Sequence, residues 1–324
     1  MRQVRFVLSL ALRLAVSLGL VAWMLSRLDA RDMGRFLARA ELGLVAITLA
    51  TVVLDRFLMA ARWMYLLEAL GLRESRARVT KIFFLSTFFG SFLPSGVGGD
   101  AVRAVSFSRL SARVEETLAS VVMDRFLGML SMFLTALVSL SVFYHLYPHP
   151  ALLVTLVGSS TLLVCGLGLL LSRSFGDRVR QAPPAGWRGW LVRTLTAFGR
   201  YRHHLGKLAA VLVFSLGVQV LRIFQAYLLS EAMDLKTPLV YFFCFIPVIL
   251  IITMLPVSLS GWGPTNLAYV ALFGRVGMDP DGAFVLSALI LGLGIVGNLP
   301  GGIIYALEGF SASRAASHFE KPTT

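Results

Sequence analysis

Residues 92–104 read FLPSGVGGDAVRA, and this stretch interrupts an apolar segment that begins with KIFFLSTFFGS. Pro94 lacks a backbone hydrogen-bond donor and therefore ends a helix. Gly96, Gly98 and Gly99 permit backbone angles that are closed to other residues. The stretch predicts a helix that stops inside the apolar segment and starts again after the break.

The composition indicates that the protein lies in lipid. The chain has 324 residues, of which 57% are hydrophobic and 15% charged, and its mean hydropathy is +0.78. The net charge of +13 comes from basic residues that lie between apolar stretches. That placement fits positive-inside anchoring and anionic lipid headgroups better than nucleic acid. We therefore expect a single integral domain over residues 1–324, in the cytoplasmic (inner) membrane.

Six stretches are apolar over about the 20 residues that a membrane-spanning helix needs. We expect the first to be retained rather than cleaved as a signal peptide, because its apolar region is long and Arg13 interrupts it. The six expected spans cover residues 6–27, 43–68, 117–146, 151–172, 207–230 and 282–308.

Two further apolar segments, 79–110 and 239–275, are each broken near the middle, the second at LPVSLSGWGP. Each half is about long enough to reach the middle of a bilayer and return. Irregular backbone at that depth is tolerated only inside protein or beside a water-filled cavity. We interpret the segments as two re-entrant helical hairpins. The alternative is a pair of ordinary spans with interfacial loops.

The order of elements is span, span, broken hairpin, span, and this order occurs twice, over residues 1–146 and 151–309. Each half has an odd number of full spans, so the second half must be inserted upside down. We therefore predict an all-α polytopic membrane protein with six full transmembrane helices and two re-entrant hairpins in an inverted repeat. Discontinuous helices in inverted repeats are typical of transporters.

Lysine and arginine counts predict the orientation. The linker 173–207 holds eight basic residues and one acid, so we expect it, and both termini, in the cytoplasm. Its segment GWRGWLVRTLTAFGRYR is typical of a helix on the inner leaflet, although a solvated linker is the alternative. The turns at 147–150 and 231–238 should face outward. The loop 27–41 should also be outside, although it holds four arginines against three acids.

The break at 92–104 also predicts an anion site. Asp100 is placed to cap the second half-helix, whose exposed N–H groups and positive dipole end attract anions. Arg103 adds a forked contact for a phosphate. We expect Ser95, Gly98 and Gly99 to complete this site. The alternative is that Asp100 and Arg103 only pair with each other.

Four charges lie inside expected spans as two adjacent pairs, Asp55-Arg56 and Asp124-Arg125. Each charge costs roughly 2.5–3.5 kcal/mol at a helix centre, so it should face protein or water and have a partner. We expect cross-pairs, Asp55 with Arg125 and Asp124 with Arg56. Pairing for structure alone and contact with substrate are both open for these residues.

Other polar residues in apolar segments are candidates for anchoring or for lining a cavity. Arg62-Trp63 should mark the membrane interface by snorkelling, and Arg13 should snorkel or line the cavity. Gln219, Arg222 and Gln225 share one helical face, which favours a cavity lining over helix–helix hydrogen bonds. The second break adds neutral candidates for binding a headgroup: Ser258, Ser260, Trp262, Thr265 and Asn266.

No set of residues indicates an enzyme. Cys165 and Cys244 lie in apolar runs, the five histidines form no zinc motif, and no nucleophile–base pair or cofactor fingerprint appears. We therefore expect no catalysis, metal or cofactor.

At four places the chain resembles the lysylphosphatidylglycerol synthase transmembrane-domain family, also called flippase-like. These are Arg62-Trp63, LPSGVGGDAVRA at 93–104, Asp124-Arg125, and LPVSLSGWGPTNLAYVALF at 255–273. Some relatives carry a soluble aminoacyl-lipid synthase, which we do not expect here. The family often shows Gly-Gly-x-Gly-x-Arg-Glu in the second break, where this chain has SGWGPTN. No role of that Arg-Glu pair is therefore carried over.

The resemblance implies movement of lipids or lipid-linked sugars between leaflets. Our hypothesis is a flippase-like translocator of an anionic lipid or polyprenyl-phosphate-linked headgroup, held by Arg103 and Arg222, with ion coupling through Asp55 or Asp124 as an option. The alternative is a non-catalytic membrane partner of a lipid-modifying or glycosyl-transferring enzyme. Self-association into a homo-oligomer is a further option.

Overall fold

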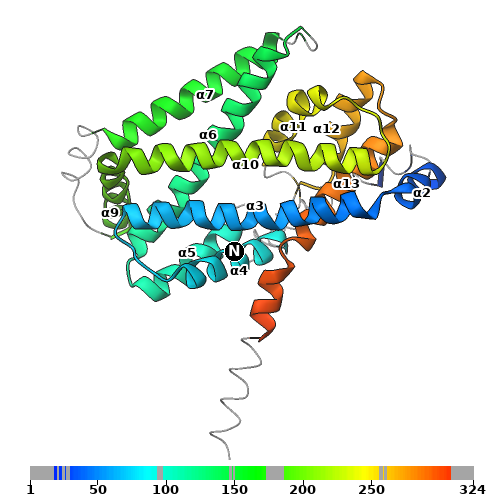
Figure 1. Cartoon of the computed structure of the whole chain (residues 1–324). Helices are drawn as coiled ribbons and strands as arrows, with labels where there is room; N and C mark the ends of the chain where they lie inside the picture. Colours follow the sequence, from blue (N-terminus) through cyan, green and yellow to red (C-terminus); the bar gives the residue numbers. More distant parts are fainter. Residues whose placement is uncertain are drawn as a thin grey trace, which may run out of the picture.

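The computed structural model describes residues 18–19, 22–23, 26, 30–92, 98–145, 148, 150–172, 186–254, 258 and 261–307. All the regular structure that these residues form is helical, which confirms the predicted all-α class (Figure 1).

Five helical segments are long and apolar enough to cross a membrane. They agree with five of the six predicted spans, and the sixth, at 6–27, falls largely outside the described residues. The protein is therefore a multi-pass membrane protein. The five segments are α3 (Leu42–Ala69), α6 (Val114–Val142), α7 (Pro150–Leu171), Val192–Ala232, which contains α10 (Leu205–Ala232), and Pro280–Leu307, which begins with α13 (Pro280–Val296).

Helices α3 and α10 lie side by side along most of their length and run in opposite directions (Figure 1). At one end the Glu41 N–H donates to the Ala232 carbonyl oxygen over 2.8 Å. At the other end the Lys207 ammonium lies 3.7 Å from the Glu68 carboxylate. These helices are the second expected spans of the two halves of the sequence, so equivalent elements pack against each other.

The first break divides α4 (Arg76–Phe92) from α5 (Gly98–Ser111), and the two helices pack together closely. A Cβ atom on Gly90 would lie 3.2 Å from Gly99 Cα, and one on Gly99 would lie 2.6 Å from the Ser86 carbonyl oxygen. Gly99 is therefore needed for the close approach of the two helices. The turn itself, including Ser95, is outside the described residues.

The second break divides α11 (Leu239–Thr253) from α12 (Pro264–Phe273), which also pack against each other. Gly261 and Gly263 have φ of +85° and +93°, which side chains other than hydrogen disfavour. The Gly263 N–H donates to Asn266 Oδ1 over 3.0 Å and caps α12. The predicted interruption therefore occurs here too.

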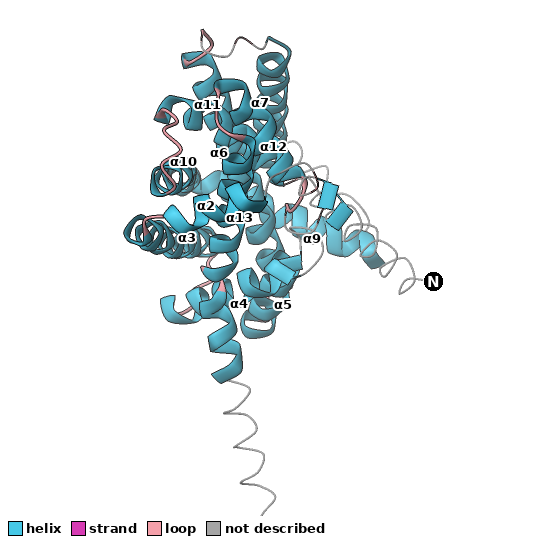
Figure 2. Ribbon diagram, turned by 90° about the vertical axis from the view of Figure 1, so that its right-hand side faces the viewer, coloured by secondary structure: helices cyan, strands magenta, loops and turns pink. Residues whose placement is uncertain are grey.

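Two helices lie in segments that connect the expected spans. α2 (Ala30–Arg39) occupies the predicted loop 27–41, where Met33 and Phe36 pack against the α11–α13 core. α9 (Gly186–Arg200) confirms that the linker holds a helix, and its place on the inner leaflet stays a prediction. Its Ala197 and Phe198 are buried against the α3–α6 core, so this end of α9 docks on protein (Figure 2).

Candidate functional site

A cavity of about 460 Å³ lies between the two breaks. Gly99 and Asp100 line it from the first break, and Ser258, Gly261 and Trp262 from the second. The described residues of the two breaks therefore line one cavity. The other walls come from α3, α4, α6, α10, α11 and the segment Pro280–Leu307, which we call the C-terminal helix. Segments distant in sequence therefore form one site.

The first group of charges is centred on Asp124 of α6, and we call it the Asp124 cluster. Asp124 Oδ1 accepts a 2.8 Å hydrogen bond from Arg62 Nε, and Oδ2 accepts one of 3.0 Å from Arg103 Nη1. Arg103 Nη2 donates to Asp100 Oδ1 over 3.0 Å, and Arg125 Nε donates to the other oxygen of Asp100. Each carboxylate in the cluster therefore contacts two guanidinium groups.

Arg103 is held by aromatic rings as well as by carboxylates. Its guanidinium carbon lies 4.8 Å from the centre of the Trp63 ring and 5.5 Å from that of Phe83. Trp63 in turn meets Phe107 edge to face at 5.4 Å. These rings fix the guanidinium plane, which a cation–π contact stabilises.

The second group is centred on Asp55 of α3, and we call it the Asp55 cluster. Asp55 Oδ2 accepts from Arg56 Nη1 at 2.5 Å and from Arg222 Nη2 at 3.3 Å. Arg56 Nε donates to Asn298 Oδ1 over 2.7 Å, and Asn298 Nδ2 donates to Ser91 Oγ over 2.8 Å. The cluster therefore joins α3 and α10 to α4 and the C-terminal helix.

The expected cross-pairs are wrong. Asp124 pairs with Arg62 and Arg103 rather than with Arg56, and Arg125 reaches Asp100 rather than Asp55. Asp55 pairs through Oδ2 with its own neighbour Arg56 and with Arg222 of α10. Arginine side chains are long enough to reach carboxylates on other helices. Such partners cannot be identified from neighbouring positions in the sequence.

The assignment of Arg62-Trp63 to the membrane interface is also wrong. Arg62 is 4% exposed and Trp63 is fully buried. Arg62 also donates to Ser215 Oγ over 3.0 Å, and Trp63 Nε1 donates to Ser120 Oγ over 3.1 Å. Snorkelling requires a guanidinium in the headgroup layer, whereas this one neutralises a buried carboxylate.

The polar stripe of α10 lines the cavity, as predicted. Gln219 Nε2 donates to Ser131 Oγ of α6 over 3.1 Å, so this residue also makes the helix–helix bond that was the alternative. Gln225 Nε2 and Ser258 Oγ are buried polar atoms of the cavity wall that find no hydrogen-bond partner among the described residues. Buried polar groups normally have partners, so these atoms suit a polar ligand.

The remaining residues that were predicted for the site either do not line the cavity or lie outside the described residues. Gly98 begins α5 but does not line the cavity. Asn266 is fully buried, caps α12 and donates to Ser287 Oγ over 2.7 Å, so it holds the second break in shape. Arg13, Ser95 and Ser260 are outside the described residues.

Sequence reasoning missed Asn298, which lines the cavity and binds Arg56. Its signal is the run GNLPGG at 297–302, a further proline–glycine break in an apolar segment. A Cβ on Gly301 would lie 2.1 Å from the Phe84 carbonyl oxygen, so this segment crosses α4 at backbone distance. The chain therefore approaches the cavity with three interrupted segments.

The charges of the cavity are unequal in number. Five arginines line the cavity and pair with three aspartates. These eight described residues together carry a net charge of +2. The arginines are Arg56, Arg62, Arg103, Arg125 and Arg222, and the aspartates are Asp55, Asp100 and Asp124. Within the described part of the chain, no group of three or more His, Cys, Asp or Glu residues is arranged to hold a metal ion.

We expect Gly99→Ala to lower the stability of the folded protein through its effect on packing alone. The added methyl group would overlap the Ser86 carbonyl oxygen, so α4 and α5 must separate. Strain of this kind costs about 1–3 kcal/mol. Thermal unfolding in detergent measures it, with Gly206→Ala as control, because a Cβ there meets nothing within 4 Å. Equal melting temperatures for both variants would contradict the close packing.

Comparison with known proteins supports the resemblance seen in the sequence. The family model described as the lysylphosphatidylglycerol synthase TM region matches residues 10–301. No curated protein matches the chain. The match covers both breaks, both charge clusters and every segment that lines the cavity. The chain therefore belongs to the family of the lysylphosphatidylglycerol synthase TM region.

Proposed function

We propose that the protein moves the headgroup of an anionic lipid, or of a polyprenyl-phosphate-linked lipid, between the leaflets of the membrane. The observation that carries this proposal is the cavity between the two breaks, whose five lining arginines share only three aspartate partners. Positive charge in excess attracts an anion, and guanidinium groups match the oxygens of a phosphate.

The unpartnered atoms of the cavity wall support the same ligand. Gln225 Nε2 and Ser258 Oγ are donors that a phosphate or sugar oxygen can satisfy. Arg103 and Arg222 lie on different helices, and each shares its aspartate with another arginine. A phosphate can therefore approach either arginine without leaving an aspartate unpaired.

The paired arrangement of elements supports alternating access. α3 and α10 pack in opposite directions, and a broken helix pair belongs to each half, α4–α5 in the first and α11–α12 in the second. In our proposal these pairs are re-entrant hairpins of an inverted repeat, entering from opposite sides. Rocking of the halves about the cavity then exposes the site to each leaflet in turn.

The test is lipid movement in vesicles that contain only the purified protein. Fluorescently labelled phosphatidylglycerol is distributed over both leaflets, and dithionite added outside destroys only the accessible label. We expect the protein to raise the destroyed fraction above the half that empty vesicles show. No increase, together with strict co-purification of a lipid-modifying enzyme, would overturn the proposal in favour of a non-catalytic partner.

The proposed orientation places α9 and both termini in the cytoplasm. With Cys165 and Cys244 replaced by alanine, single cysteines at His203 and Lys236 test it, because both positions are exposed. We expect an impermeant maleimide to label the Lys236 site in intact cells and the His203 site only after permeabilisation. Labelling of the His203 site in intact cells would reverse the topology.

A further inference from the structure

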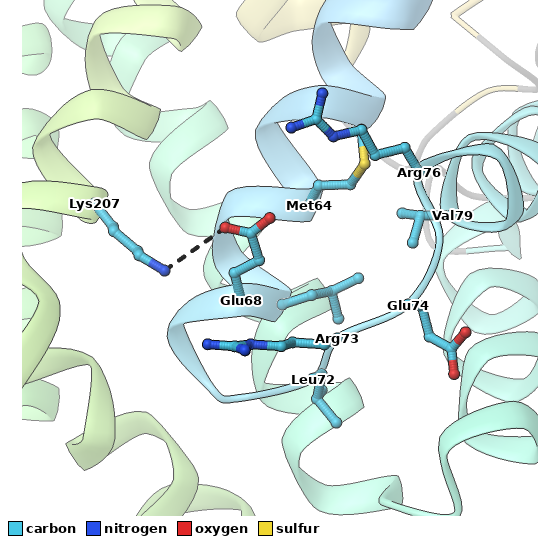
Figure 3. A pocket seen from close by; sticks show the side chains of 9 residues that line it. Met64, Glu68, Leu72, Arg73, Glu74, Arg76, Val79 and Lys207 are labelled. Atoms are coloured by element: carbon cyan, nitrogen blue, oxygen red, sulfur yellow. Dashed lines mark ion pairs between the residues drawn. The ribbon is translucent and has the colours of Figure 1, made fainter.

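A second pocket, of about 350 Å³, lies at the end of the molecule where α3 turns into α4 (Figure 3). The buried side chains of Leu67, Leu72 and Val79 contribute its apolar part. None of its residues lines the central cavity. It is therefore a separate site on the same helices.

The charges around this pocket do not balance. Glu68 faces Lys207 at 3.7 Å, and Glu74 pairs with Arg78 at 2.8 Å, so both acids of the pocket have a basic partner. Arg73 and Arg76 are exposed, and no ion pair joins either of them to an acid among the described residues. The acids are thus occupied, and two guanidinium groups remain for an external anion.

The orientation of the side chains agrees with this charge count. In Figure 3 the guanidinium groups of Arg73 and Arg76 extend on the side of the Glu68–Lys207 pair, whereas the Glu74 carboxylate points away from it. The pocket therefore presents its two unpaired basic groups on one side.

The position of the pocket indicates where its ligand comes from. The membrane-spanning helix α3 ends at Ala69, just before Leu72 and Arg73, and Lys207 lies near the start of α10. Apolar residues that meet basic side chains at the end of a spanning helix match a phospholipid, whose glycerol and acyl carbons adjoin a charged phosphate.

We infer that this pocket binds the headgroup of an anionic phospholipid from the leaflet at the α9 end. Arg73 and Arg76 hold the phosphate, Lys207 stays with Glu68, and the half-buried Met64 offers an apolar contact to the glycerol end of the acyl chains. The site is independent of the proposed transport, because it shares no residue with the central cavity.

Native mass spectrometry of the full-length protein in detergent tests the inference. Dioleoyl phosphatidylglycerol and dioleoyl phosphatidylcholine are titrated separately against the wild type and the double variant Arg73→Gln/Arg76→Gln. The matched control is Arg109→Gln/Arg202→Gln, which removes two charges from the same end of the protein but outside the pocket. Glycerol 1-phosphate, added as a competitor, distinguishes a lipid from a soluble phosphate.

We expect the pocket to add one phosphatidylglycerol to any that the central cavity retains, and to bind it more tightly than phosphatidylcholine. The Arg73/Arg76 variant should weaken that binding by about tenfold or more, as two surface cations contribute, with an unchanged melting temperature. Equal losses in the two variants would show a diffuse basic surface and overturn the site. Displacement by millimolar glycerol 1-phosphate would instead assign it to a soluble phosphate.

Discussion

Asp124→Asn is expected to lower the free energy of unfolding by about 3–5 kcal/mol, the usual cost of breaking a buried ion pair on one side. Asp124 is the carboxylate that neutralises both Arg62 and Arg103, which are 4% and 3% exposed. Asparagine has the same shape but no charge. Arg62 would then keep only the neutral Ser215 hydroxyl. A buried guanidinium without a counter-charge is the source of the cost.

Asp100→Asn is the matched control for this prediction. Asp100 also contacts two arginines, but Arg103 would retain Asp124 and Arg125 is 40% exposed. We therefore expect a loss of about 1 kcal/mol or less, as for a pair with one exposed partner. The prediction that Asp100 caps α5 is wrong, because the helix begins at Gly98 and Asp100 lies inside its first turn, so no cap is lost with asparagine. Denaturant unfolding of both variants in the same detergent gives the comparison. Equal losses would show that Asp124 is not the centre of the network.

The breaks in the helices were predictable because their causes are local. Proline and glycine act on their own backbone, so LPSGVGG and LPVSLSGWG indicate interruptions without knowledge of the fold. The run GNLPGG at 297–302 carries the same signal, but it lies at the end of an expected span. Its importance becomes visible only where Gly301 meets Phe84.

The pairing of charges was not predictable in the same way. Whether Asp124 meets Arg56 or Arg62 depends on the rotation of α3 about its axis and on the reach of a flexible arginine. The role of Asn266 was not predictable for the same reason. Its amide oxygen caps α12 by accepting from the N–H of Gly263, which has a positive φ, and its amide nitrogen donates to Ser287. The sequence therefore indicates which residues need partners but not which partners they find.

Arg103→Gln is expected to lower the transport rate strongly while leaving the protein folded. Each carboxylate that Arg103 contacts has a second arginine, since Asp124 keeps Arg62 and Asp100 keeps Arg125. The network therefore remains neutralised without it. A hydrogen bond to a charged group contributes about 1.5–3 kcal/mol, so transport should fall by roughly ten- to a hundredfold.

Arg103→Lys separates charge from geometry. Lysine keeps the positive charge but lacks the planar fork that bridges Asp100, Asp124 and a phosphate and that lies over Trp63. We expect transport between that of the wild type and that of the glutamine variant. Arg109→Gln is the control, because it removes an exposed charge from the same helix. Vesicle transport rates and melting temperatures are measured together for all three variants. If Arg103→Gln loses as much stability as Asp124→Asn, then Arg103 is part of the scaffold, and the anion must be bound by the Asp55 cluster through Arg56 and Arg222.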